Sequence, residues 1–274
     1  MIDYVVIGFL QGIIEWLPVS SQGSLVFYIS NFLKISPEVS LDYSIFLHIG
    51  TLFAAMLYFR KELCSIFSYK NIKLLLKYNF QIFKVKNNDV EDDFLMLRFL
   101  FFSVATTFLI AIPIYFFIRE KFLLSTVSHI NLLIGILLFV TGFLILLSGK
   151  KMVQKYNLSI KNSILLGVAQ GFAIIPGLSR SGLTTSTLLF RGFPPEKSLK
   201  ISFLLSIPTM IIGEIGFLFL KGLFFSPYAL ISLLISFIIG YLTIGLLLKF
   251  AQKINFSYFC FILGLIYIFV FLIE

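Results

Sequence analysis

Long apolar runs alternate with short polar connections along most of this chain. A helix needs about 20 apolar residues to cross the hydrocarbon core of a bilayer, which is about 30 Å thick. Six runs reach that length and are predicted to be transmembrane helices: residues 42–60, 96–118, 126–149, 198–220, 228–248 and 255–273. The pattern therefore predicts an all-α polytopic membrane protein.

Two further apolar regions are interrupted before they reach that length. In each, a break rich in proline, glycine and serine separates two short pieces: residues 2–17 from 24–34, and residues 163–175 from 182–191. Irregular backbone is tolerated at membrane depth only where it is buried in protein or lines a wet cavity. Both regions are therefore predicted to be re-entrant helical hairpins.

Lysine and arginine set the orientation, because cytoplasmic loops carry an excess of both. The basic connections 60–95 and 150–161 are placed inside, and the first of them resembles an amphipathic helix on the inner surface. Following the chain outward from these loops puts the C-terminus outside. The first hairpin then enters from outside and the second from inside.

The two hairpins also share a sequence pattern. A Gly-x-x-Gln-Gly segment opens each one and a Ser-x-x-Gly segment closes each break, at residues 8–12 and 167–171, and 20–23 and 179–182. We interpret the chain as one membrane domain made of an inverted repeat, with halves of about 1–149 and 150–274; chance matches in apolar sequence are the alternative. Inverted repeats with broken helices place a polar site near the midplane.

Composition excludes a soluble globule and narrows the partners. The 274 residues are 59% hydrophobic and 13% charged, with a mean hydropathy of +1.01. The net charge of +9 lies mostly in the two inside connections, so it indicates topology and no nucleic-acid partner is expected. Cys64 and Cys260 fit no disulfide or metal spacing, and no P-loop occurs.

Few acids lie inside apolar sequence, where a carboxylate costs several kcal/mol unless it is paired or wet. Glu15 is the strongest candidate, because Gln11 precedes it by four residues on the same helical face and Ser20 and Ser21 follow. This group supplies a base or cation ligand, an amide and two hydroxyls. The alternative is an acid that only lines a channel.

Two other acids have simpler explanations. Asp42 begins a predicted span and serves either as an N-cap or interfacial residue or in function. Glu214 lies deep in an apolar run, where a structural hydrogen bond to a neighbouring helix explains it most simply and function is the alternative.

Arg180 is the basic residue that lies inside a helix break. Ser179 and Ser181 flank it and Thr184 follows, so hydroxyls, free N–H groups at a helix start and a guanidinium together predict a phosphate site. A structural ion pair is the alternative. His48, in the first full span, is either a satisfied core residue or a catalyst, and His129 is predicted to lie at the membrane interface.

These residues carry a family resemblance. Residues 11–23, Gln-Gly-Ile-Ile-Glu-Trp-Leu-Pro-Val-Ser-Ser-Gln-Gly, resemble the E/Q-x-x-x-E and Phe-Leu-Pro-Val-Ser-Ser motif of the bacitracin-resistance-type undecaprenyl diphosphatases. Residues 176–184, Pro-Gly-Leu-Ser-Arg-Ser-Gly-Leu-Thr, resemble that family's second signature, Pro-Gly-x-Ser-Arg-Ser-Gly-x-Thr. Segments 58–62 and 202–208 are also similar to the family, so the resemblance covers most of the chain.

The resemblance implies a hydrolase of the plasma membrane that converts undecaprenyl diphosphate to the monophosphate and so recycles the lipid carrier of cell-envelope glycan synthesis. It also implies six spans and two inverted hairpins, with an active site that opens outward. The implied catalytic residues are Glu15, Ser21 and Arg180, and the implied substrate-binding residues are Gln11, Ser20, Ser179, Ser181 and Thr184.

The implied cofactor is a divalent cation, Mg²⁺ or Ca²⁺, held by Glu15 and Gln11, without an organic cofactor. The expected partners are the polyprenyl diphosphate, the bilayer and a second copy of the chain in a homodimer. A transporter or flippase for polyprenyl phosphate or another anion is the alternative from a different class, because inverted repeats with broken helices are also transporter features.

The chain departs from the family pattern at one position. Many members have a histidine three residues after the second serine of the first motif, where this chain has Ser24. Either Glu15 acts as the base, through a cation-bound water, or His48 approaches from the next span. A type-2 phosphatidic acid phosphatase mechanism is disfavoured because no histidine lies near Ser179 and Arg180 in the sequence.

Overall fold

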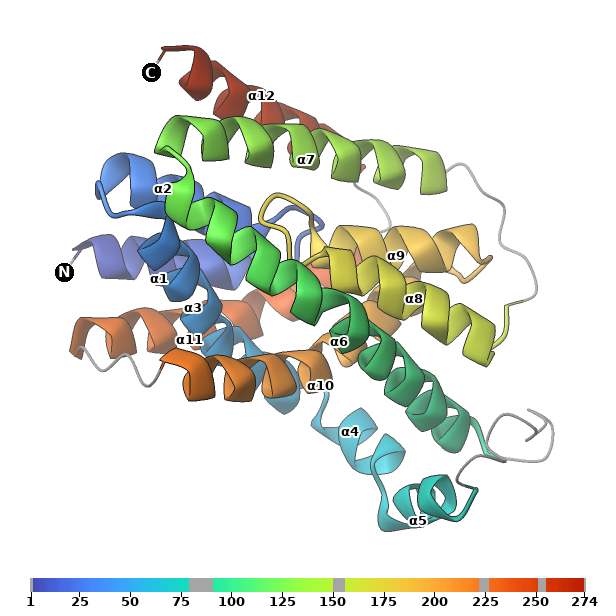
Figure 1. Ribbon diagram of the computed structural model, residues 1–274. Helices are drawn as coiled ribbons and strands as arrows, with labels where there is room; N and C mark the ends of the chain where they lie inside the picture. The colour runs from blue at the N-terminus through green and yellow to red at the C-terminus, as the bar shows by residue number, and fades with distance from the viewer. Residues whose placement is uncertain (1, 79–90, 150–155, 222–226, 251–254, 274) are drawn as a thin grey trace.

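The computed structural model describes residues 2–78, 91–149, 156–221, 227–250 and 255–273 (Figure 1). Within these ranges the chain is helical and contains no strand, which confirms the all-α prediction. The helices are α1 (Ile2–Ile14), α2 (Ser21–Phe32), α3 (Pro37–Tyr58), α4 (Arg60–Ile66), α5 (Tyr69–Tyr78), α6 (Asp92–Leu124), α7 (Val127–Ser148), α8 (Ile160–Phe172), α9 (Arg180–Phe190), α10 (Pro195–Lys221), α11 (Pro227–Phe250) and α12 (Ser257–Ile273).

Five helices are long and apolar enough to cross a bilayer: α3, α6, α7, α10 and α11. They correspond to five of the six predicted spans. The sixth, predicted over 255–273, forms α12 with 17 residues, which is short of the usual length. The span predicted at 96–118 is the centre of a longer helix, α6, because Asp92 and Asp93 extend it with acidic side chains that suit the positive end of the helix dipole.

The two broken regions form helical hairpins that enter the bundle from opposite ends (Figure 1). The hairpin of α1 and α2 and the hairpin of α8 and α9 meet through their loops. The Gly177 N–H donates to Ser20 Oγ at 3.0 Å, and Ser181 Oγ donates to the Leu17 carbonyl at 2.7 Å. Gly177 has a φ of +106°, which glycine adopts without strain.

Serines at the two breaks start the second helix of each hairpin. Ser20 Oγ accepts from the Gly23 N–H, and Ser179 Oγ accepts from the Gly182 N–H, each at 3.1 Å. Both serines have extended backbone dihedrals and are therefore N-caps in the usual geometry. The breaks predicted from sequence are thus sites where a helix begins inside the protein.

Each hairpin packs its first helix against a long helix from the other part of the chain. In α1, a Cβ on Gly8 would lie 2.4 Å from the Ser232 carbonyl oxygen of α11, and in α8 a Cβ on Gly167 would lie 2.5 Å from the Ser103 carbonyl oxygen of α6. The same two serines donate to backbone carbonyls of α1 and α8, respectively. Equivalent glycines and serines therefore make equivalent contacts in the two parts of the chain.

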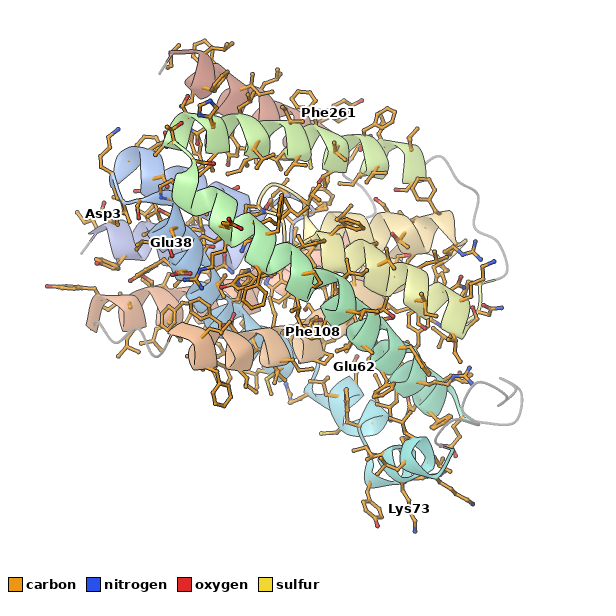
Figure 2. All side chains as sticks on the ribbon, in the orientation of Figure 1. Asp3, Glu38, Glu62, Lys73, Phe108 and Phe261 are labelled. Atoms are coloured by element: carbon orange, nitrogen blue, oxygen red, sulfur yellow. The ribbon has the colours of Figure 1, made fainter. Side chains whose placement is uncertain are left out.

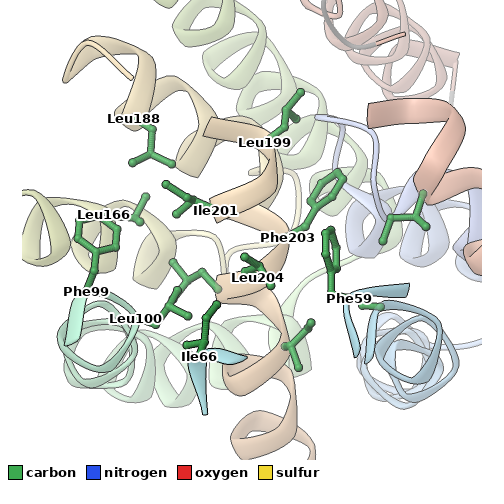
Figure 3. Close-up of a cluster of buried hydrophobic side chains, with 14 of the residues drawn as sticks. Phe59, Ile66, Phe99, Leu100, Leu166, Leu188, Leu199, Ile201, Phe203 and Leu204 are labelled. Atoms are coloured by element: carbon green, nitrogen blue, oxygen red, sulfur yellow. The ribbon is translucent and has the colours of Figure 1, made fainter. Parts of the chain in front are cut away.

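The largest apolar cluster surrounds α10 and fixes the first break against it (Figure 3). Phe203 packs edge-on against Trp16, with ring centroids 5.2 Å apart, and Phe59 and Phe99 belong to the same cluster. Trp16 Nε1 also donates to the Gly240 carbonyl at 3.1 Å. The residue next to Glu15 is thereby held by packing and by a hydrogen bond.

Several charged side chains lie toward the two ends of the molecule. Asp3 and Glu38 lie at one end, and Glu62 and Lys73 lie at the other (Figure 2). Arg119 contacts Glu38 at 3.2 Å, and Lys200 contacts Glu62 at 2.8 Å. Part of the basic sequence that predicts the orientation, at positions 84, 86, 150, 151 and 155, lies outside the described residues.

A pair of glycine substitutions tests this packing. On Gly50 of α3, a Cβ would lie 1.9 Å from Ser236 Oγ and 2.5 Å from the Leu233 carbonyl oxygen of α11, whereas on Gly213 of α10 it would have nothing within 4 Å. We expect Gly50→Ala to destabilise the protein by about 1–3 kcal/mol through overpacking. Gly213→Ala should be neutral or stabilising by up to about 1 kcal/mol. Thermal unfolding followed by circular dichroism checks this, and equal shifts for both variants would contradict the packing.

Candidate active site

A cavity of about 560 Å³ lies where the two hairpin loops meet α3, α6 and α10. Its polar wall comes from the loops and the helix starts that follow them. The rest is largely apolar and is built mainly by α6 and α10, including Phe108, Phe116 and Phe217. The cavity therefore combines a compact polar end with a larger apolar wall, the distribution of polarity that suits an amphiphilic ligand.

Glu15 is the centre of the polar end. Its side chain is 2% exposed, yet its carboxylate is surrounded by donors. Arg180 Nη2 donates to Oε1 at 2.6 Å, while Ser21 Oγ and Gln11 Nε2 donate to Oε2 at 2.7 and 3.0 Å. The structure thus brings together three residues of the first hairpin and one of the second, as the sequence predicted.

Arg180 is the first residue of α9 and joins the two hairpins through Glu15. Its Nη2 is committed to the carboxylate, but its Nη1 has no hydrogen-bond partner among the described residues. The side chain lines the cavity. One edge of the guanidinium is therefore held by an ion pair, the structural alternative that the sequence left open, while Nη1 is buried and unbonded within the described part of the chain. Anion binding at Arg180 stays a prediction.

His48 approaches the same carboxylate from α3. Its Nε2 lies 3.3 Å from Glu15 Oε2, and its Nδ1 lies 3.1 Å from the Ile45 carbonyl oxygen. Both ring nitrogens face oxygen acceptors, an arrangement that the doubly protonated imidazolium satisfies by donating two hydrogen bonds. One carboxylate then sits between two cations, so the cluster carries a net positive charge.

Ser21 is placed for nucleophilic chemistry. It is the first residue of α2 and lines the cavity, and its hydroxyl donates to a carboxylate, the pairing expected of a nucleophile with its base. The N-termini of α2 and α9 both lie at the cavity wall. Helix N-termini favour phosphate groups because their N–H groups are free and their dipoles are positive.

The other predicted binding residues divide into two groups. Ser20, Ser179 and Ser181 line the cavity but also use their hydroxyls as caps or loop contacts, as described above. Gln11 and Thr184 do not line it. Gln11 faces Glu15 and Thr51, and Thr184 Oγ1 bonds to Ser202 at 2.6 Å and to the Arg180 carbonyl. Gln11 and Thr184 therefore contact the residues that line the cavity without lining it themselves.

Ser24, which replaces the histidine of many family motifs, faces away from the cluster. It accepts a hydrogen bond from Tyr267 of α12 at 3.0 Å and does not line the cavity. The imidazole of this site comes from His48, one of the two alternatives that the sequence left open. The sequence does not predict this contact, because Ser24 and Tyr267 are 243 positions apart.

A second polar wall was not predicted. Gln170 Nε2 donates to Thr209 Oγ1 at 2.9 Å and to Thr107 Oγ1 at 3.3 Å, and all three residues line the cavity together with Glu214. Glu214 is 7% exposed, and its Oε2 has no hydrogen-bond partner among the described residues. The repeated Gly-x-x-Gln-Gly segment is the signal that could have identified Gln170.

Helix boundaries decide one of two minor predictions, while the interfacial position of His129 stays a prediction. Asp42 is not an N-cap, because α3 begins at Pro37 and Asp42 is buried in its second turn. His129 is exposed near the start of α7 and bonds to Thr126, the N-cap of that helix.

The predicted cation ligands Glu15 and Gln11 do not suit a metal ion in this geometry. Both carboxylate oxygens of Glu15 already accept from donors, two of which are cationic groups, and Gln11 turns its NH₂ rather than its oxygen toward Glu15. The described residues also hold no group of three or more His, Cys, Asp or Glu side chains able to bind a metal. We therefore assign no catalytic step to a cation at Glu15.

Comparison with known proteins agrees with the motifs. The family model described as bacitracin resistance protein BacA matches residues 4–266. An undecaprenyl-diphosphatase of Methanococcoides burtonii is 35% identical over 264 residues, which cover 96% of each chain. Proteins of the same name from Methanothrix thermoacetophila and Sulfurisphaera tokodaii are each 34% identical, over 96% of this chain and 93% and 94% of theirs.

Proposed function

The chain belongs to the bacitracin resistance protein BacA family, and on that premise we propose that it hydrolyses undecaprenyl diphosphate to the monophosphate and inorganic phosphate. The observation that carries the proposal is the Arg180–Glu15–Ser21 cluster at the polar end of a largely apolar cavity. It offers an anion-binding edge, a base and a hydroxyl at one point.

The cavity divides the substrate into two parts. The diphosphate lies against the free edge of Arg180 and the N-termini of α2 and α9, where positive charge and N–H groups gather. The isoprenoid chain lies along the apolar wall between α6 and α10. Burial of that chain supplies affinity, while the charged end positions the phosphorus atom.

The reaction follows from these positions. As Ser21 Oγ attacks the terminal phosphorus, Glu15 takes its proton and the bond to the bridging oxygen breaks. The bridging oxygen keeps the electron pair and leaves as part of polyprenyl monophosphate. Glu15 passes the Ser21 proton to an oxygen of the departing monophosphate and so returns to its carboxylate form. Water then attacks the phosphoseryl phosphorus while Glu15 takes a proton from the water. The Ser21 Oγ–phosphorus bond breaks, and Glu15 returns that proton to Ser21 Oγ, which releases phosphate and restores Ser21.

Arg180 and His48 supply charge stabilisation rather than covalent chemistry. The guanidinium neutralises charge on the transferred group, which is the main contribution that a protein makes to phosphoryl transfer. His48 orients the Glu15 carboxylate through its 3.3 Å contact. When Glu15 gains a proton, the positive charge of His48 favours its return to the carboxylate form.

The chain is a multi-pass membrane protein, and we propose a finer topology for it. The α1–α2 and α8–α9 hairpins are re-entrant, α12 completes six spans, and the two parts of the chain form an inverted repeat. The matched glycine and serine contacts of α1 and α8 support this arrangement. The positive-inside pattern supports a cavity that opens outward from the plasma membrane.

This placement suits recycling of the lipid carrier for cell-envelope glycan synthesis, the role that the resemblance to the undecaprenyl diphosphatases implies. A transporter or flippase is not favoured. A binding site for a transported anion needs the Arg180 edge but has no need for a hydroxyl paired with a carboxylate at 2.7 Å.

The proposed function is tested with the purified protein in lipid nanodiscs. We expect phosphate release from undecaprenyl diphosphate and, after rapid acid quenching, phosphate on Ser21 detected by peptide mass mapping. Ser21→Ala should abolish the labelled peptide. Translocation of labelled lipid without phosphate release would contradict the proposal.

The isoprenoid path predicts a chain-length effect. Gly213 and Gly216 line the cavity with nothing within 4 Å of a Cβ, so they leave bare backbone on the apolar wall. We expect Gly216→Leu to raise KM for undecaprenyl diphosphate by about 10–200-fold, the usual effect of a few misplaced apolar carbons. KM for the much shorter farnesyl diphosphate should stay within twofold. An equal increase in KM for both substrates would contradict the proposed path of the isoprenoid chain along this wall.

A further inference from the structure

The short helix α5 exposes two different rows of side chains. Tyr69, Ile72 and Leu76 form an apolar row and are 80%, 39% and 67% exposed. The residue that follows each of them is an exposed lysine, which gives a basic row of Lys70, Lys73 and Lys77. Successive residues of a helix are about 100° apart, so the two rows run side by side along α5. The helix therefore presents an amphipathic surface away from the rest of the protein.

The opposite side of α5 is fixed to the protein. Asn71 is 2% exposed, and its Nδ2 donates to the carbonyls of Ser65 and Ile66 at the end of α4, at 3.1 and 3.2 Å. Leu75 packs against the large apolar cluster around α10. These contacts determine the rotation of α5 about its axis, and they leave the apolar and basic rows facing outward.

The position of α5 along the molecule matches the edge of a bilayer. The chain between the spans α3 and α6 contains α4 and α5, and both lie at the end of the bundle where α3 ends and α6 begins (Figure 1). Exposed apolar residues rimmed by charge mark an interaction surface. Beside the ends of two spans, the surface within reach is the bilayer, where apolar side chains enter the acyl boundary and lysines extend to the phosphate layer.

The charge of the basic row favours one class of lipid. Lys70 contacts Glu91 at 2.5 Å, which offsets its charge. Within the described residues, no acid forms an ion pair with Lys73 or Lys77. Two uncompensated positive charges beside an apolar row attract anionic headgroups more strongly than zwitterionic ones.

We propose that α5 lies in the plane of the membrane interface and binds anionic phospholipids. The apolar row enters the acyl boundary, and Lys73 and Lys77 contact the lipid phosphates. The sequence predicts an amphipathic helix in this connection, and the two rows add the class of lipid that it binds. The inference does not depend on the proposed hydrolysis, because no described residue of α5 lines the cavity of the candidate active site.

The position of the helix is tested with nitroxide labels on the full-length protein in vesicles of equal parts phosphatidylcholine and phosphatidylglycerol. Cys64→Ser removes the exposed cysteine and leaves the buried Cys260, and the label is attached through Leu76→Cys or Lys77→Cys. We expect oxygen, which partitions into lipid, to reach the label at position 76. A water-soluble nickel chelate should reach the label at position 77. Because the two positions are adjacent on one helix, the difference reports the orientation of α5.

The lipid preference is measured by native mass spectrometry of the protein released from nanodiscs with equal amounts of phosphatidylglycerol and phosphatidylcholine. The Lys73→Gln/Lys77→Gln variant should lose at least about fivefold of the wild-type preference for phosphatidylglycerol, the effect of one lysine near a charged surface. Lys73→Arg/Lys77→Arg keeps both charges and should stay within twofold. The matched control, Lys161→Gln/Lys249→Gln, removes two exposed lysines from α8 and α11 and should also stay within twofold.

Equal access of the nickel chelate to both labels would place the apolar row in water and overturn the proposal. Protection of both labels from both reagents would mean that another protein surface covers α5, which also overturns it. An unchanged lipid preference in Lys73→Gln/Lys77→Gln would remove the anionic headgroups from this helix. An equal loss in Lys161→Gln/Lys249→Gln would assign the preference to net charge instead of to α5.

Discussion

Replacing Arg180 with alanine should lower kcat/KM for undecaprenyl diphosphate by at least about 10³-fold, the lower end of what arginine contributes to phosphoryl transfer. The variant loses the guanidinium edge that is free for phosphate, and it also leaves Glu15 with one cationic neighbour in place of two. Phosphate release from the purified variant measures the loss. Both binding and chemistry should suffer, because the same group holds the diphosphate and neutralises the transferred phosphoryl group.

Two further variants show whether the loss is specific to this guanidinium. Arg180→Lys keeps a charge but cannot contact Glu15 and phosphate with two edges, so most of the loss should remain. Arg191→Lys is the matched control, because Arg191 follows α9 at its other end and contacts Asn162 at 2.7 Å. It should retain activity within about threefold, as expected of a surface polar contact. Near-normal activity of Arg180→Ala would remove the proposed phosphate site.

The sequence predicted those features whose causes are local. Helix breaks follow from proline, glycine and capping serine, so the positions of both hairpin loops could be predicted without the structure. Glu15 and Arg180 were identifiable because charged residues are rare inside apolar sequence. Their 2.6 Å contact then follows from two hairpins that enter from opposite ends and meet at their loops.

The features that the sequence left open depend on tertiary packing. Whether His48 is a core residue or part of the site depends on the rotation of α3 against the first hairpin, which periodicity does not determine. The sequence shows Ser24 only as a departure from the family's histidine. In the structure the Ser24 hydroxyl accepts a hydrogen bond from Tyr267, a tertiary contact that the sequence does not indicate. A structural hydrogen bond to a neighbouring helix is the simplest expectation for Glu214, whereas the structure gives its buried Oε2 no donor among the described residues.

Replacing Glu15 with glutamine should lower kcat by about 10²–10⁴-fold, the range for loss of a general base. The amide is nearly isosteric and can still accept from Arg180, but it cannot take the Ser21 proton. Because the substitution removes a negative charge beside Arg180 and His48, the polar end becomes more positive. The variant should therefore bind the diphosphate at least as tightly as the wild-type protein does. We expect KM to stay equal or to fall while kcat decreases by the factor given above.

The matched control is Glu38→Gln, which removes the partner of Arg119 at 3.2 Å in an ion pair whose two side chains are each 25% exposed. Such pairs contribute about 0–1 kcal/mol, so activity should change little. The Mg²⁺ dependence of Glu15→Gln then separates two roles for Glu15. A base surrounded by four protein donors predicts an unchanged half-maximal Mg²⁺ concentration with a reduced rate, whereas a cation ligand predicts a large increase in that concentration. The second result would return the metal to Glu15 and contradict the role given to it here.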